Sequence, residues 1–187
     1  MTLHSDSSSA TEAAAPRSRI RSMTRTALMA AVLVICSQIA FPLPGGIPVT
    51  LQTFAIALLG GILGPGKGAA AVAVYLAMGA AGIPVFAGFK GGLDVLAGPT
   101  GGFLIGFLPM AALMGQSRGR IHRFLCPAAG LLACHSIGLI WLCVLTGLPL
   151  FKAFMVASLP FLLKDVLSVA TALTLAATIR RRLNGRL

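Results

Sequence analysis

The chain has 187 residues, of which 57% are hydrophobic and only 10% are charged, and its mean hydropathy is +0.92. Soluble domains usually contain about 25% charged residues, so this composition excludes an ordinary soluble domain and indicates one membrane-embedded unit. The formal net charge of +11 could suggest nucleic acid, but the basic residues stand at the ends of apolar runs, where they signal topology and meet anionic lipid headgroups. We therefore expect membrane lipid, and no nucleic acid, as the surrounding partner.

The N-terminal segment 1–22 is predicted to be a disordered, basic, cytoplasmic tail, because residues 1–16 are polar and rich in Ser and Ala. A signal peptide is the alternative interpretation of the apolar run 27–41 that follows. That run is long for the apolar part of a signal peptide, and no small-residue cleavage site ends it. We therefore predict a retained first membrane span.

Apolar runs continue to the C-terminus, and a span needs about 20 residues to cross ~30 Å of hydrocarbon. On that scale the sequence predicts six spans, at about 24–42, 47–64, 67–83, 99–116, 124–146 and 150–179. The predicted fold is all-α: a polytopic membrane protein with a compact bundle of six transmembrane helices. It would occupy residues 23–183, followed by a short cytoplasmic tail at 184–187.

The basic residues divide unequally between the two sides of this predicted bundle. The twelve on the side of the N-terminus are Arg17, Arg19, Arg21, Arg25, Lys67, Arg118, Arg120, Arg123, Arg180, Arg181, Arg182 and Arg186. The other side receives Lys90, Lys152 and Lys164. Because cytoplasmic loops carry the excess of Lys and Arg, we expect both termini in the cytoplasm of a multi-pass protein of the bacterial cytoplasmic membrane.

The turn between the second and third predicted spans, Gly61 to Gly68, resembles a phosphate-binding loop. An apolar span precedes it instead of a strand, and Gly68 stands where the loop needs a hydroxyl for Mg²⁺. No convincing second acidic ligand for Mg²⁺ is present either. We therefore predict a simple turn and no ATP hydrolysis by this chain.

Metal and hydrolase chemistry also find no support in the sequence. The histidines, His4, His122 and His135, are far apart, and no His, Cys or carboxylate set has ligand spacing. His135 and Ser136 are adjacent, so on a helix their side chains diverge by about 100° and cannot pair as base and nucleophile. Cysteines occur only within apolar segments and without a Cys-x-x-Cys pair, which favours burial as small apolar side chains. We predict no metal, no cofactor and no enzyme.

Small residues recur four positions apart and so share helix faces on which backbones can approach closely. The sets are Ala27/Ala31, Ala69/Ala73/Ala77/Ala81 and Gly102/Gly106. One interpretation is packing within the bundle. The other is that the Ala27/Ala31 face docks a second membrane protein.

Four acidic residues are present, and two of them, Asp94 and Asp165, lie beyond the N-terminal tail. Asp94 shares an outer loop with Lys90, either as a solvated pair or in a binding role. Asp165 lies ~22 Å along a helix from the arginines at 180–182, within the outer third of a bilayer. A charge there costs on the order of 3 kcal/mol and normally faces a cavity or partner. The alternative is a Lys164–Asp165 pair at the membrane interface.

Pro160 can break the last helix, which is tolerated where backbone lines a cavity. Polar residues expected at the same level are Gln38, Thr50, Gln52 and the loop from Gly98 to Gly102. Together with Asp165 they predict an outward-facing and mostly apolar pocket. It suits a small amphipathic molecule with hydrogen-bonding and anionic ends.

Four motifs stand out in this sequence: Gly-Ile-Pro-Val-Thr-Leu-Gln-Thr-Phe at 46–54, Gly64-Pro65, Gly-Ile-Pro-Val-Phe-Ala-Gly at 82–88 and Leu-Ala-Gly-Pro-Thr-Gly-Gly-Phe-Leu-Ile-Gly-Phe at 96–107. Together they resemble the BioY family, the biotin-binding membrane subunits (S components) of energy-coupling-factor (ECF) transporters. The resemblance covers about residues 25–180. It implies a six-helix subunit that captures biotin, the transported ligand, from outside and associates with a transmembrane coupling subunit and two ATPase subunits. Ala27 and Ala31 would contact the coupling subunit, and a solitary member would instead self-associate.

Biotin matches the predicted pocket, because its ureido N–H groups suit a carboxylate and its valerate needs a cation. The expected ligand contacts are Asp165, Lys164, Ser168, Gln52, Thr50, Lys90, Gly98, Thr100 and Gly101. The family pattern Pro-Phe-x-x-Gly-Asp-x-x-Lys has Lys164 at the Gly position and Ser168 at the Lys position. Lys164 could replace the family cation from one turn further out, Lys90 could meet the valerate, or specificity could differ. The alternative functions are an S component for another vitamin or a biotin precursor, and a non-transporting membrane assembly partner.

Overall fold

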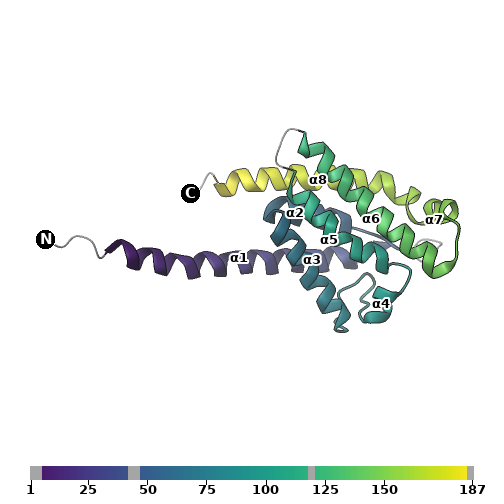
Figure 1. Ribbon diagram of the computed structural model, residues 1–187, viewed down its shortest axis with the longest axis horizontal. Coiled ribbons are helices and arrows are strands. Elements are labelled where there is room, and N and C mark those ends of the chain that lie inside the picture. The colour runs from purple at the N-terminus through teal and green to yellow at the C-terminus, as the bar shows by residue number, and fades with distance from the viewer. Residues whose placement is uncertain (1–5, 42–46, 118–120, 185–187) are drawn as a thin grey trace.

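The computed structural model describes residues 6–41, 47–117 and 121–184, which form a helical bundle (Figure 1). Its elements in chain order are α1 (Asp6–Gln38), β1 (Ala40–Phe41), β2 (Val49–Thr50), α2 (Gln52–Leu63), α3 (Pro65–Ala80), α4 (Leu93–Ala97), α5 (Gly101–Gly115), α6 (His122–Thr146), α7 (Leu150–Ala157) and α8 (Leu159–Asn184). The start of α1 and the end of α8 lie towards the same end of the molecule (Figure 1).

Helices α1, α2, α3, α5, α6 and α8 lie where the sequence predicts the six spans. Three stretches are long and apolar enough to cross a membrane: Arg19–Gln38 of α1, His122–Thr146 and Leu159–Arg182. Helix α2 has 12 residues and α5 has 15, which at 1.5 Å per residue gives only ~18 and ~22 Å. The described chain is therefore a mostly helical membrane protein with three candidate spans and shorter apolar helices packed among them.

The first helix begins well before the position expected from the sequence. Residues 6–22, predicted as part of a disordered tail, are helical and continuous with the first span. The Ala-rich stretch at 13–15 has high helix propensity, which favours a helix there although Pro16 within α1 cannot donate a backbone hydrogen bond. This part of α1 projects beyond the other helices (Figure 1).

The last predicted span is divided into two helices. Ser158 lies between α7 and α8 with φ −127° and ψ −49°, and its backbone N–H still bonds to the carbonyl of Phe154. Pro160 is the second residue of α8, where its missing N–H costs no helical hydrogen bond. The break at Ser158 lies seven residues before Asp165.

The outer loop between α3 and α5 is folded against the bundle. Phe86 and Lys90 form an isolated antiparallel bridge, and α4 follows. Phe86 is buried against Gly79 of α3, where a Cβ would lie only 2.0 Å from the phenyl ring. The loop is also tied to α1 by the side chain of Gln38, whose amide donates to the carbonyls of Val85 and Phe86.

Close helix packing holds the centre of the bundle, where α5 packs most extensively on α6 and α2 packs on α8. A Cβ on Gly102 would lie 2.3 Å from Cβ of Trp141, and one on Gly106 would lie 2.9 Å from Cα of Cys134. The Gly102/Gly106 face therefore serves packing within the bundle. Ala27 and Ala31 of α1, by contrast, are exposed.

Candidate ligand-binding site

A cavity of about 650 Å³ lies within the bundle, between the outer loop, α2, α5, α6 and α8. Its walls are mainly apolar, and the aromatic side chains among them are Phe86, Phe89, Phe103, Phe107 and Phe161. The volume lies within the range of small-molecule sites, which are largely apolar with a few fixed polar groups. The polar groups determine what such a cavity can bind.

Seven of the nine expected ligand residues line this cavity: Asp165, Lys164, Gln52, Thr50, Lys90, Gly98 and Thr100. Ser168 and Gly101 do not. Ser168 lies on α8 one turn beyond Lys164, and a Cβ on Gly101 would meet the carbonyl of Leu96. The cation position of the family pattern therefore does not face the cavity in this chain.

Asp165 supplies the buried carboxylate of the cavity, with its side chain only 7% exposed. Oδ2 lies 3.2 Å from Nε2 of His135, and Oδ1 lies 2.5 Å from the ammonium of Lys164. Within the described residues, Oδ1 accepts no hydrogen bond of good geometry, so its contact with Lys164 is an ion pair. Because buried acceptors are normally satisfied, a ligand N–H donor fits this oxygen.

The Lys164 side chain contacts both the next residue, Asp165, and a neighbouring strand. Its ammonium also donates to the backbone carbonyl of Thr50 at 2.9 Å, which joins α8 to β2. The side chain is 26% exposed, compared with 7% for Asp165. The Lys164–Asp165 pair therefore lies in the cavity wall. The Lys164 ammonium already forms an ion pair with Asp165 and a hydrogen bond with the Thr50 carbonyl.

His135 of α6 is a site residue that the sequence did not reveal. Nδ1 lies 2.9 Å from Oγ of Ser158, and Nε2 faces Asp165. An ionised carboxylate only accepts hydrogen bonds, so Nε2 carries the proton and donates to Asp165. The partners lie 23 and 30 residues further along the chain, whereas the adjacent Ser136 points away from His135 on the helix. A single His in an otherwise apolar span was the available signal.

A second polar wall is built around Gln52 at the start of α2. Thr50 Oγ1 donates to Gln52 Oε1 at 2.8 Å, and Gln52 Nε2 donates to the Tyr75 hydroxyl at 2.7 Å. Tyr75 is fully buried on α3 and was also missed by the sequence argument. These bonds fix the orientation of the Gln52 amide, so this wall is rigid before any ligand enters.

Charged residues of the outer loop complete the cavity. Lys90 and Asp94 line it and are both exposed, and no ion pair joins them within the described part of the chain. The carbonyl of Gly98 accepts a bond of 3.0 Å from the indole of Trp141, which fixes this edge to α6. The cavity thus combines a buried carboxylate on α8 with an exposed ammonium on the loop.

No group of three His, Cys, Asp or Glu side chains suited to a metal ion is found among the described residues. The four cysteines are free thiols, at Cys36, Cys126, Cys134 and Cys143.

Comparison with known proteins agrees with the motifs. The BioY family model matches residues 7–185. The chain is 38% identical over 162 residues to the "Probable biotin transporter BioY" of Pyrococcus horikoshii, covering 87% of this chain and 98% of that protein. It is 34% identical over 166 residues to the "Biotin transporter BioY" of Thermotoga maritima, covering 87% and 97%.

A solved structure shares the architecture. The fold is similar, with a TM-score of 0.81 and 25% sequence identity, to the S component for biotin from an ECF-type ABC transporter, and the match covers 88% of this chain and 93% of that one. The chain belongs to the BioY family.

Proposed function

We propose that this chain captures biotin and mediates its uptake as the substrate-binding subunit of an ECF-type transporter, without transforming it chemically. The observation that carries the proposal is the buried Asp165, whose Oδ1 has a charge partner but no hydrogen bond, in a cavity of about 650 Å³. The relatives named biotin transporters and the structural similarity to a biotin S component support the same ligand.

Biotin binds in this proposal with its ureido ring at Asp165 and its valerate at Lys90. The ureido N–H groups donate to the carboxylate, and His135 and Lys164 hold that carboxylate in its orientation. Lys164 is committed to Asp165 and Thr50, so the exposed ammonium of Lys90 is the cation for the valerate. Biotin is the transported ligand, and we propose no cofactor.

The remaining expected residues have supporting positions in this scheme. Thr50 and Gln52 form the rigid wall beside the ligand, and Gly98 and Thr100 form the opposite edge of the cavity. Ser168 and Gly101 act indirectly, through the packing of α8 and of the loop.

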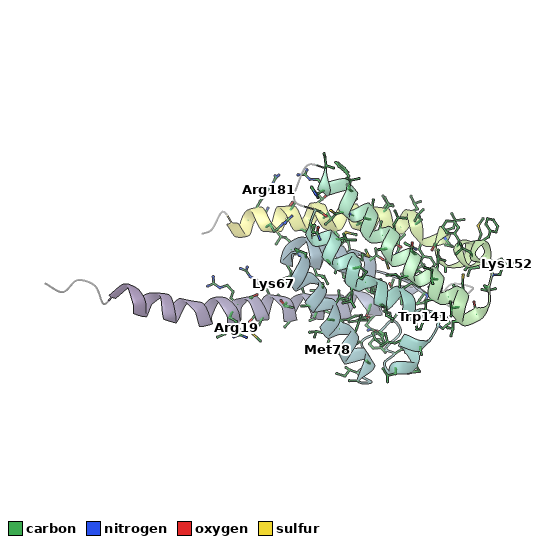
Figure 2. The ribbon with its side chains drawn as sticks, in the orientation of Figure 1. Arg19, Lys67, Met78, Trp141, Lys152 and Arg181 are labelled. Carbon is green, nitrogen blue, oxygen red and sulfur yellow. The ribbon has the colours of Figure 1, made fainter. Side chains whose placement is uncertain are left out.

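In the membrane, the chain is proposed to have six spanning helices and both termini in the cytoplasm. The labelled Arg19, Lys67 and Arg181 lie towards the end of the bundle where α1 enters and α8 finishes, whereas Lys152 lies at the opposite end (Figure 2). This separation agrees with the excess of basic residues that cytoplasmic segments carry. The host membrane is then the cytoplasmic membrane of the cell.

Energy for uptake comes, in this proposal, from a transmembrane coupling subunit and two ATPase subunits. The exposed Ala27 and Ala31 of α1 are the proposed contact with the coupling subunit, because small residues let a partner helix approach closely. Self-association is the alternative if the chain works alone.

Calorimetric titration of the protein purified in mild detergent tests the ligand. Biotin, desthiobiotin, thiamine and riboflavin would be compared on the same preparation, with size-exclusion and circular-dichroism profiles as the check of folding. We expect submicromolar affinity for biotin. Tighter binding of thiamine or riboflavin would instead indicate a sibling vitamin subunit, and well-folded protein that binds none of them would favour a membrane assembly partner.

A further inference from the structure

A second concavity, of about 1,550 Å³, lies between α6 and α8, towards the opposite end from the outer loop. Helix α6 packs on α5, and α8 packs on α2, so the two helices leave a trough between them. Its sides are mostly apolar, with two threonines of α8 among them, and include Pro127, Ala128, Leu131, Val169, Ala170 and Leu173. We call this concavity the α6–α8 groove.

One end of the α6–α8 groove is strongly basic. Lys67 from the start of α3, Arg123 from the start of α6 and Arg181 from the end of α8 all line it and are exposed. Arg21 and Arg25 of α1 line the same end. No acidic residue is present among the described residues that line the groove. This end therefore attracts an anion.

The apolar part continues from this basic end for a considerable length. It extends along α8 from Arg181 to Val166, a distance of ~22 Å at 1.5 Å per residue. Small side chains, Ala128 on α6 and Ala170 and Ala177 on α8, keep the trough open. At its inner side the groove reaches Leu131, which also lines the ligand cavity.

We propose that the α6–α8 groove is a specific binding site for an anionic phospholipid. The phosphate contacts Arg123, Arg181 and Lys67, and one acyl chain lies along the trough. A soluble anion would use only the basic end, whereas a zwitterionic lipid would fill the trough but bring an ammonium group that the basic end repels. Charge complementarity together with ~22 Å of apolar length selects the anionic lipid, which has both parts.

Native mass spectrometry of the full chain in mild detergent tests the proposal, with phosphatidylglycerol and phosphatidylcholine added in turn. We expect tighter binding of phosphatidylglycerol. The double variant Arg123→Gln/Arg181→Gln should weaken its binding about 30-fold, since each surface cation contributes about fivefold, and should weaken phosphatidylcholine binding much less, because that lipid has no net charge. Lys152→Gln, an exposed cation at the opposite end of the bundle, is the matched control and should have no effect. If the double variant fails to fold, Lys67→Gln should alone give about a fivefold loss.

A second pair of variants tests the apolar part. Ala128→Phe should fill the trough and weaken phosphatidylglycerol binding about tenfold or more, which corresponds to ~1.4 kcal/mol. Ala129→Phe, at the neighbouring exposed position that does not line the groove, should change nothing. Equal affinity for the two lipids would overturn the proposal. So would equally tight binding of glycerol 3-phosphate, which has the charge without the chain, or failure of wild-type protein to retain any lipid.

Discussion

At the scale of single residues, the proposed site depends on how Asp165 is held. The carboxylate is contacted by His135 from α6 and Lys164 from its own helix, and Lys164 continues to Thr50. The chain thus replaces the Gly of the family pattern with a cation that stabilises the buried charge. Removal of one partner of such an ion pair strongly destabilises the folded protein, because an uncompensated buried charge remains.

His135 is proposed to position Asp165, and substitutions of His135 test this role through both stability and biotin affinity. His135→Phe removes the donor to Asp165 and the acceptor for Ser158, and leaving buried polar groups unpaired costs about 1–3 kcal/mol. We expect a lower melting temperature and weaker biotin binding, measured by thermal unfolding and calorimetry in one detergent. His135→Gln, which can still donate a hydrogen bond, should recover part of both. Wild-type affinity in His135→Phe would remove this residue from the site.

The roles of Lys90 and Lys164 can be distinguished by comparing ligands with and without a carboxylate. Lys90→Ala should weaken biotin binding roughly tenfold by loss of a charge-assisted contact. The affinity for biotin methyl ester, which lacks the carboxylate, should stay nearly unchanged. Lys164→Ala should weaken both ligands alike, because it acts through Asp165. Calorimetric titrations with the two ligands give both answers. The opposite pattern would assign the valerate to Lys164.

At the scale of elements, the outer loop forms one wall of the cavity and packs Phe86 against Gly79. Gly79→Val should displace the ring at a cost of about 1–3 kcal/mol of overpacking, lower the melting temperature and weaken biotin binding. Gly66→Ala is the matched control on the same helix, since a Cβ there meets nothing within 4 Å. Unchanged stability in Gly79→Val would mean that the loop does not depend on this contact.

The positions of the apolar helices could be predicted because long runs of apolar residues identify them without knowledge of packing, and three of these helices are long enough to be candidate spans. The division of the last run at Ser158 could not, since Pro160 is compatible both with a kink and with the start of a helix. Asp165, Thr50, Gln52 and Lys90 were found because polar groups are rare in this chain. His135 and Tyr75 were missed because their roles depend on partners brought close by helix packing.

At the scale of the whole molecule, the proposed ligand cavity and the proposed coupling contact lie on different surfaces. The cavity lies among the outer loop, α2, α5, α6 and α8, whereas Ala27 and Ala31 are exposed on α1. Ala31→Trp should therefore leave biotin affinity in detergent unchanged while reducing uptake of labelled biotin by cells roughly tenfold or more, by blocking close helix approach. Ala129→Trp on the exposed face of α6 is the control. Loss of binding in Ala31→Trp would contradict this separation.

The central claim is that Asp165 binds the ureido end of biotin. The most direct measurement is the dissociation constant of biotin for Asp165→Asn beside wild type, with Asp94→Asn as the same chemical change at an exposed cavity residue. A hydrogen bond to a charged group contributes about 1.5–3 kcal/mol, so Asp165→Asn should bind biotin about 10- to 100-fold more weakly. Asp94→Asn should lose much less affinity for biotin. Wild-type affinity in a well-folded Asp165→Asn protein would contradict the account.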